Sequence, residues 1–134
     1  MTYEALENLI RSRYHDKVGK FVPTIYDNES EEKPNFPDDL WTRVAIRHGE
    51  KSQVQLGEKR TWRNIGLLFV QIFVKTGTGS QQSMNLADRV SSYFKGVSVD
   101  GVTYKTPSVF HVGSSDGYYQ MNVQCPFYAD DLEA

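Results

Sequence analysis

The chain has 134 residues, of which 39% are hydrophobic and 24% charged, and its formal net charge is −2. These totals fit one domain with a hydrophobic core of its own, and no apolar run approaches the roughly 20 residues that cross a bilayer. The single cysteine, Cys125, excludes an internal disulfide and a zinc site built on paired thiolates, and it is predicted to be buried. We expect one domain over residues 1–134, made in a cytoplasm because the first residues lack the pattern of a secretory signal.

Residues 2–17 are predicted to form a first helix because their apolar side chains recur at helical spacing. These side chains are Tyr3, Leu6, Leu9, Ile10 and Tyr14. Pro23 has no amide donor, so residues 21–26 are predicted to be extended and to suit a sheet edge. Residues 27–39 carry six acids and one apolar side chain, Phe36, and predict an exposed acidic loop of unusual length.

The next stretch predicts a hairpin that leads into the centre of the fold. Residues 40–48 alternate as a strand with Val44 and Ile46 inward, residues 49–52 form a turn, and residues 53–56 run back beside the first strand. Together with the strand that follows, this hairpin predicts a meander of three antiparallel strands.

Residues 62–74 form the predicted central strand, because both sets of its alternating side chains are apolar. A strand of this kind is expected to be covered on both faces. The glycines of residues 75–80 interrupt the pattern, Ser80 is a predicted N-cap, and a helix is predicted to run to about Lys95. The apolar stripe by which this helix packs on the strand consists of Leu86, Ala87, Val90, Tyr93 and Phe94.

The C-terminal third is predicted to add further strands. The pair Asp100-Gly101 lies between alternating apolar residues and is the strongest hairpin signal in the chain. Residues 108–112 predict another strand, and residues 118–127 predict a last one with one apolar and one polar face. The whole order predicts an α+β fold in which two helices pack on an antiparallel or mixed sheet of about six to eight strands.

No set of residues predicts catalysis. The loop at residues 75–80 lacks the Lys-Ser or Lys-Thr pair that ends a phosphate-binding loop. Ser108 and His111 lie three residues apart, on opposite faces of one predicted strand, which argues against a catalytic triad with Asp116. The three histidines fall in separate elements and have no metal-ligand spacing. We therefore expect no enzymatic activity, no cofactor and no metal.

The charge of the chain is unevenly distributed. Acids gather in residues 27–39 and at the C-terminal end, whereas bases gather around the predicted meander, beside Trp41 and Trp62. These bases are Arg43, Arg47, Lys51, Lys59, Arg60 and Arg63. A nucleic-acid surface is one interpretation, but the pI of 5.9 is far from the basic values of such domains. A solvated sheet face, or a basic surface that meets the acidic loop of a neighbouring subunit, needs fewer assumptions.

Several short motifs follow one another along nearly the whole chain. They are MTYEALE at residues 1–7, PDDLWTRVAI at 37–46, QLG at 55–57, RNIGLLFVQIF at 63–73, GTGS at 77–80, MNLADRV at 84–90 and VQCPFYAD at 123–130. Their order resembles the tail terminator family of long-tailed bacteriophages.

That resemblance implies an α+β subunit that forms a ring, commonly a hexamer, which caps the finished tail tube and ends its polymerisation. The implied partners are further copies of the chain, the tail tube protein and the connector or neck protein of the head. DNA would pass through the lumen without specific binding, and no catalysis, cofactor or membrane is implied. The expected location is the head-proximal end of the virion tail, after synthesis in the host cytoplasm. The alternatives are a neck or head-completion protein of the same junction and, in a different class, a small nucleic-acid-binding module.

A ring subunit needs two lateral surfaces that fit each other, and charge can segregate between them. We therefore predict that an acidic side chain of residues 27–39 in one subunit approaches an arginine of the meander in the next. The acidic candidates are Glu32, Asp38 and Asp39, and the arginines are Arg43, Arg47 and Arg63. The remaining interface candidates are Phe36, Trp41, Trp62, Gly77, Gly79 and Gln82. Acids are expected to outnumber bases on loops that face the lumen.

Overall fold

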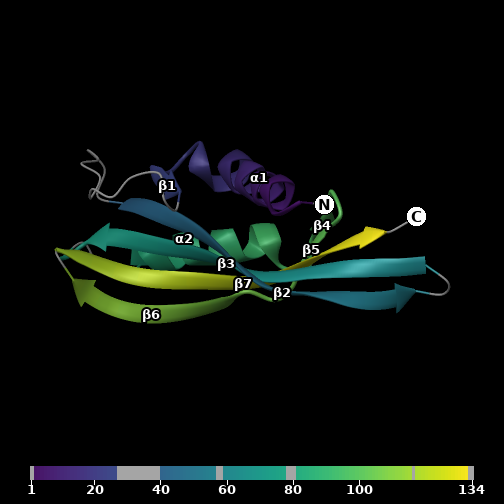
Figure 1. The fold of residues 1–134 in the computed structure, drawn as a ribbon. Coiled ribbons are helices and arrows are strands. Elements are labelled where there is room, and N and C mark those ends of the chain that lie inside the picture. The colour runs from purple at the N-terminus through teal and green to yellow at the C-terminus, as the bar shows by residue number, and fades with distance from the viewer. Residues whose placement is uncertain (1, 27–39, 57–58, 78–80, 116, 133–134) are drawn as a thin grey trace.

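The computed structural model describes residues 2–26, 40–56, 59–77, 81–115 and 117–132, which form two α-helices on one mixed sheet of seven strands (Figure 1). The strand order is β1-β2-β3-β7-β5-β4, and β6 also pairs with β7. The α+β fold class and the size of the sheet are therefore as the sequence predicts.

The first helix and the edge strand are confirmed. Helix α1 spans Tyr3–Tyr14, and the Thr2 side chain caps it by accepting a hydrogen bond of 3.1 Å from the Ala5 amide. A π-helical turn over His15–Gly19 ends the helical segment, and β1 follows at Thr24–Tyr26. β1 pairs in parallel with β2, at one end of the strand order.

The predicted turn at residues 49–52 is wrong, and the predicted meander is a hairpin of two long strands. β2 runs without interruption over Leu40–Leu56 and pairs with β3, which spans Lys59–Lys75. The register shifts between His48 and Lys51, so that β2 has an extra residue there and the ladder then resumes. A β-bulge of this kind absorbs an inserted residue without ending the strand, which is why polar turn-forming residues do not turn here.

The second helix and the hairpin after it are confirmed. Helix α2 spans Gln81–Phe94, β4 spans Ser98–Val99 and β5 spans Val102–Tyr104. Asp100 and Gly101 between the two strands have φ angles of +54° and +81°. Positive φ at both positions is what a type I′ turn requires, so this dipeptide fixes the hairpin locally.

The last two strands are longer than predicted. β6 spans Ser108–Ser115, and β7 spans Tyr118–Leu132. β7 pairs with β3 along its whole length, with β6 beside its first half and with β5 further on. Its alternation of a buried and a half-buried face agrees with the prediction of a one-sided strand.

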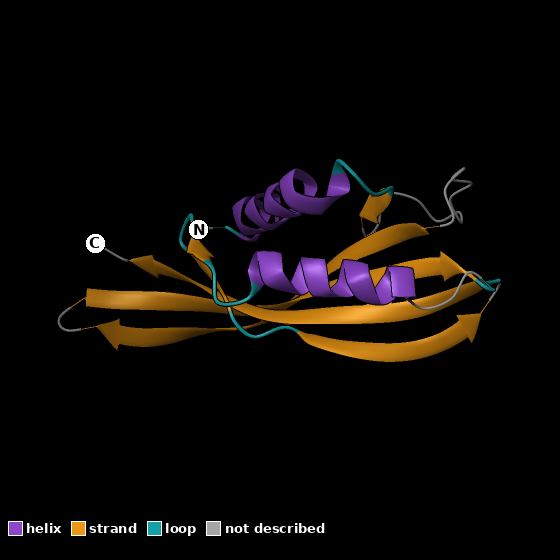
Figure 2. Ribbon diagram, turned by 180° about the vertical axis from the view of Figure 1, so that it is seen from behind, coloured by secondary structure: helices purple, strands orange, loops and turns teal. Residues whose placement is uncertain are grey.

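Both helices pack on the same face of the sheet (Figure 2), where they enclose one core. The buried apolar residues of the helices are Leu6, Ile10, Tyr14, Leu86, Ala87, Val90 and Phe94. On β3 this covered face carries Leu68, Val70, Ile72 and Val74, each 0–1% exposed. Cys125 on β7 is buried in the same core, as predicted.

The expectation that β3 is covered on both faces is wrong for the described residues. Both helices pack their apolar stripes against the same face of the sheet, and together they form a single core there. On the other side of β3, Ile65 remains 44% exposed.

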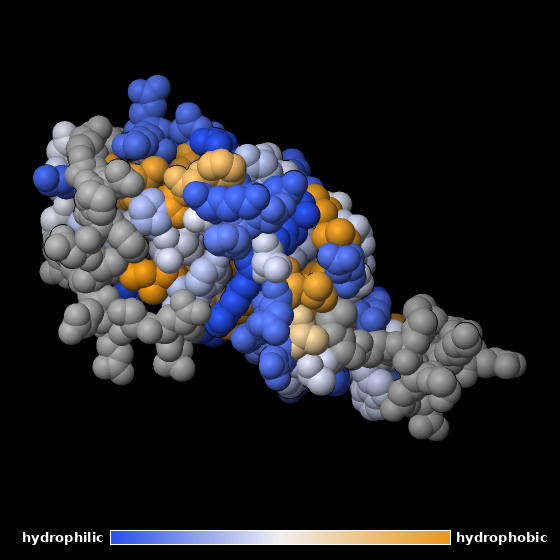
Figure 3. Space-filling model, turned by 90° about the horizontal axis from the view of Figure 1, so that it is seen from above, coloured by the Kyte–Doolittle hydropathy of each residue, from blue (hydrophilic) through white to orange (hydrophobic). Residues whose placement is uncertain are grey.

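Some predictions fall on residues that the structure does not describe. The acidic loop at residues 27–39, the N-cap Ser80 and residues 57–58 of the β2–β3 connection lie outside the described ranges. In the part that is described, neither α1 nor α2 is long and apolar enough to span a bilayer. The molecule seen from above, from the side of α1, is mostly hydrophilic with scattered apolar patches (Figure 3).

Candidate interaction surface

The face of the sheet opposite the helices, here called the outer face, carries side chains from alternate positions of four strands. The register between β2, β3, β7 and β6 aligns these positions in rows across the sheet. The outer face consists of Trp41, Arg43, Ala45, Arg47, Ile65, Leu67, Phe69, Gln71, Phe73, Phe110, Gln120, Asn122 and Gln124. Among the described residues no helix covers it, and Phe110 is 47% exposed.

One end of the outer face is an aromatic cluster. The rings of Trp41 and Phe73, which face each other in the β2–β3 register, are stacked with centroids 4.1 Å apart and an angle of 12°. Tyr118 meets Trp41 edge-on at 5.9 Å, and the Arg43 guanidinium lies over both stacked rings at 5.6 and 6.0 Å. Such ring pairs contribute roughly 0.5–1.5 kcal/mol beyond their buried area. Trp41 is 2% exposed, so it packs within its own chain, whereas Arg43 above it is half-buried.

The three candidate arginines share the outer side of the sheet but differ in their surroundings. Arg43 is half-buried over the aromatic rings, and Arg47 is exposed. Arg63 forms two hydrogen bonds of 2.8 and 2.9 Å to the carboxylate of Asp130, the residue opposite it on β7. These hydrogen bonds hold the pKa of Asp130 below its ordinary value. Arg63 therefore has an acidic partner within its own chain, whereas the distinguishing property of Arg47 is its greater exposure to solvent.

The other predicted interface residues are only partly described. Glu32, Phe36, Asp38, Asp39 and Gly79 lie outside the described residues, so their approach to the arginines stays a prediction. Gly77 has a φ of +96° and lies in open space, because a Cβ added there would meet nothing within 4 Å. Gln82 is exposed at the start of α2. Trp62 is half-buried and points to the opposite side of the sheet from Arg63, its chain neighbour.

The sequence did not single out the exposed apolar residues at the β6 end of the sheet. Val109, Phe110 and Val112 are 40%, 47% and 54% exposed. The sequence signal for this exposed surface is that residues 108–115 have apolar side chains on both faces and contain no Lys, Arg, Asp or Glu. A buried central strand can have the same composition, so the signal indicates an exposed surface only once the strand is known to lie at an edge.

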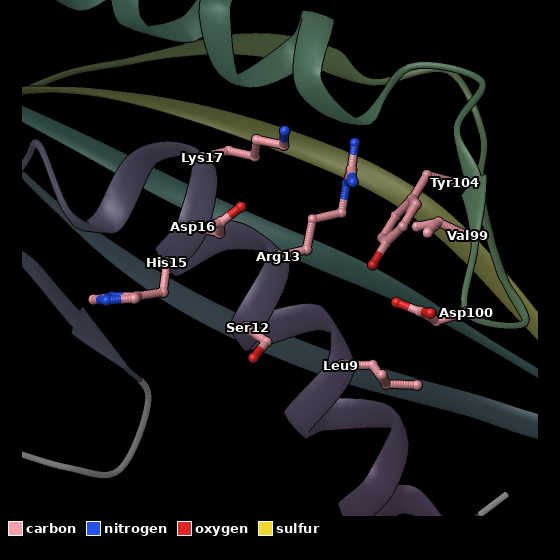
Figure 4. Close-up of a pocket in the computed structure, with 9 residues that line it drawn as sticks. All are labelled: Leu9, Ser12, Arg13, His15, Asp16, Lys17, Val99, Asp100 and Tyr104. Carbon is pink, nitrogen blue, oxygen red and sulfur yellow. The ribbon is translucent and has the colours of Figure 1, made fainter.

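A groove with a volume of about 450 Å³ lies between α1 with its π-helical turn and the β4–β5 hairpin (Figure 4). Arg13 reaches across it: its guanidinium donates to the Tyr93 carbonyl and lies 5.5 Å from the Phe94 ring and 5.9 Å from the Tyr104 ring. Asp16 at the rim is paired with Lys20 at 3.0 Å. The arrangement anchors α1 to the second helix and the hairpin.

His48, His111 and Cys125, side chains of the kinds most often used in catalysis, lie in separate places and have separate partners. His48 shares a hydrogen bond of 2.9 Å with Glu7, and His111 shares one of 2.7 Å with the Tyr119 hydroxyl. Burial raises the pKa of the Cys125 thiol to about 12, so this thiol is not ionised near neutral pH. Within the described ranges no three His, Cys, Asp or Glu side chains gather as metal ligands would.

Comparison with known proteins identifies the class to which this one-sided sheet belongs. The sequence model of phage tail terminator proteins matches residues 4–127, and the chain therefore belongs to that family. It is a structural component of a phage tail, associated with other tail components, and the family is structural rather than enzymatic.

A solved structure shares the fold, with a TM-score of 0.63 over 92% of this chain and 94% of its own. The two sequences are 15% identical, and the name of that structure is a sequence identifier that states no activity. The search of curated proteins found no match.

Proposed function

We propose that this chain forms a ring, of six subunits, that caps the end of a phage tail tube, stops its polymerisation and presents the surface to which the connector of the head binds. Residues 1–134 act in this ring as a single domain. The observation that supports the proposal best is the one-sided sheet: in a chain of the tail terminator family, the covered face builds the core and the outer face remains for contacts.

The composition of the outer face suits contact with protein. Exposed apolar side chains such as Ile65 and Phe110 lie there beside arginines and amides. Protein interfaces are enriched in aromatic residues and Arg, and contiguous exposed apolar surface usually marks an interaction site.

The charge pattern allows the proposed contact between ring subunits to be tested by charge reversal of individual residues. In the proposal, Asp38, Asp39 or Glu32 of one subunit approaches Arg43 or Arg47 of the next, which places opposite charges across a head-to-tail contact. Reversal of both arginines to Glu is expected to weaken ring assembly at low and moderate salt, as measured by light scattering after size-exclusion chromatography. Arg89, exposed on α2, is the matched control for a charge reversal away from the outer face.

A compensating variant sharpens the test. If Asp38→Lys and Asp39→Lys restore assembly to the Arg43→Glu/Arg47→Glu variant, the charges act across the contact. If the double reversal assembles like the wild-type chain, the charge contact is wrong, although another contact could still close a ring.

The function itself is tested on tails assembled without this protein. A terminator stops tube growth, so electron microscopy is expected to show overlong tubes, and addition of the purified chain is expected to restore a uniform length. Tubes of normal length that merely fail to join heads would instead favour a neck or head-completion protein. A stable monomer that is retained on heparin would favour the nucleic-acid-binding alternative.

DNA is proposed to pass through the ring without being held. A lumen that does not grip phosphate should carry more acids than bases on its loops, because cationic side chains would bind the backbone. A structure of the assembled ring with a basic lumen would contradict this part of the proposal.

A further inference from the structure

Among the described residues, β6 is an open edge of the sheet and has few of the features that usually protect such an edge. It pairs with β7 on one side, and on its other side the described residues provide no strand. Edge strands present unpaired backbone groups, and proteins commonly guard them with charged side chains, proline or a short length. Ser108–Ser115 contains no Lys, Arg, Asp, Glu or Pro, and its guarding feature is the bulge between His111 and Gly113.

The opposite side of the sheet has a second and different open edge. β1 pairs with β2 only over Thr42–Val44, so from Ala45 to Leu56 the described part of the sheet ends at β2. One subunit therefore carries two unlike strand edges, one on each side of the sheet.

Strand directions make these two edges compatible. β2 is antiparallel to β3, β3 to β7, and β7 to β6, so β6 runs opposite to β2. If a second copy continues the sheet in the same orientation, its β2 meets β6 as an antiparallel neighbour, which is the more stable kind of pairing.

We propose that β6 of one subunit pairs with the open part of β2, from Ala45 onward, in the next subunit, so that the sheet runs through the subunit contact. This inference rests on the ring proposed above and specifies how the ring closes. A head-to-tail ring requires two different surfaces that fit each other, and two unlike edges of one sheet meet that requirement. The pairing satisfies backbone groups of both strands and covers Val109, Phe110 and Val112.

The proposed pairing also implies a stagger between subunits. Through the registers of β7 and β3, Ser108 lies level with Ala45, and β6 continues from there past the part of β2 that β1 covers, toward Leu40. To reach the open part of β2, the neighbouring subunit must be displaced along the strands by several residues. A constant displacement of this kind tilts the strands relative to the axis of a closed ring, as in β-barrels.

Disulfide trapping in the full chain tests the pairing directly, because the one native cysteine is buried. Phe110→Cys lies on the outer face of β6, and on the outer side of β2 the partners are Arg47→Cys, Ser52→Cys or Val54→Cys, each combined with Phe110→Cys in turn. At least one combination is expected to give a ladder of crosslinked species beyond the dimer on non-reducing gels. Lys51→Cys, which points to the other side of β2, is the control and is expected to give none.

Two results would overturn the pairing. If rings form by light scattering but no outer-face combination crosslinks, the ring closes through another surface, and the proposed function stands without this contact. If Phe110→Cys alone gives dimers and no larger species, β6 pairs with β6 of a second copy. If the wild-type chain stays monomeric both in solution and on tube ends, the proposed ring is wrong, and the proposed strand pairing is wrong with it.

Charged substitutions supply an independent measurement. Val109→Lys/Val112→Lys places two charges on the proposed edge, and Met84→Lys, at a similarly exposed apolar residue of α2, is the matched control. The double variant is expected to need about tenfold or more subunit concentration to assemble, with an unchanged thermal unfolding transition. Assembly at the wild-type concentration would contradict the pairing.

Discussion

The two faces of β3 are both apolar in sequence but have different surroundings in the fold. On the covered face, Ile72 is 0% exposed beneath the helices, whereas on the outer face Ile65 of the same strand is 44% exposed. An apolar pattern on both sides of a strand therefore indicates two contacts without saying whether the same chain makes both. Here the helices make one of these contacts, and no described element makes the other.

The largest expected effect is a difference in stability between alanine variants of Ile72 and Ile65, one on each face of β3. Ile72→Ala is expected to lower the free energy of unfolding by about 2–5 kcal/mol, because it leaves a cavity in a packed core. Ile65→Ala is expected to lower it by less than about 1 kcal/mol, because its side chain is already half in water. Urea denaturation of the unassembled chain measures both, and equal losses would mean that the outer face is packed within the subunit.

Close packing on the covered face predicts the next largest effect. A Cβ at Gly66 would lie 2.5 Å from Cζ of Phe127 and 2.7 Å from the Arg47 carbonyl oxygen. Gly66→Ala is therefore expected to destabilise the fold by about 1–3 kcal/mol in the same assay. Gly49→Ala is the control, because its Cβ would meet the half-exposed Ile65 side chain at 3.0 Å, which has room to move. If Gly66→Ala leaves the free energy of unfolding unchanged, the close approach of the Phe127 ring to Gly66 is contradicted.

The buried hydroxyl of Tyr14, at the end of α1, is expected to make a smaller contribution to stability, and this contribution depends on pH. Tyr14 donates a hydrogen bond of 2.9 Å to Thr42, whose hydroxyl also contacts that of Thr24 at 2.8 Å. Tyr14→Phe is expected to lower the free energy of unfolding at pH 7 by about 0.5–1.5 kcal/mol.

Burial raises the pKa of Tyr14 from 10.0 to about 12, so the unfolded chain loses this proton first as the pH rises. The contribution is complete below pH 10 and is lost between pH 10 and about 12. The stability advantage of the wild-type chain over Tyr14→Phe is therefore expected to shrink across that range. An advantage that stays constant would show that Tyr14 is not protected from ionisation.

The smallest effect is expected for the ion pair of Arg63 and Asp130, whose side chains are 34% and 26% exposed. Such pairs contribute about 0.2–1 kcal/mol, so the coupling energy from the cycle of Arg63→Gln, Asp130→Asn and the double variant should fall in that range. Because the pKa of Asp130 is lowered, the contribution is present above the ordinary value of 3.8 and decreases as the pH falls below it. A coupling energy of zero at pH 7 would leave Arg63 available to an acidic residue of a neighbouring subunit.

Local signals predicted much of the fold. The spacing of Leu6 and Ile10 predicted α1, Asp100-Gly101 predicted the β4–β5 hairpin, and the stripe through Val90 predicted α2, because each signal acts within a few residues. The turn predicted at Gly49 failed because the cross-strand ladder with β3 is a non-local constraint, and a bulge lets β2 continue through residues that favour a turn.

The candidate surface was predictable only in part. Arg43, Arg47 and Arg63 were singled out from their charge, and alternation along the strands does bring them to one side of the sheet. The internal partner of Arg63 could not be predicted, because Asp130 is 67 residues away and becomes its neighbour only through the β3–β7 register. The exposed edge at Val109 and Val112 was missed for the same reason.

Patterns within the amino-acid sequence were enough to establish the α+β class, most helices and strands, the burial of Cys125 and the resemblance to tail terminators, since these follow from local spacing and motif order. The folded chain was needed to establish that β2 is continuous, that both helices lie on one face, and that β6 and the second part of β2 are edges of the sheet as far as the described residues extend. Those features depend on which distant strands pair and in what register, and no local pattern in the chain encodes that choice.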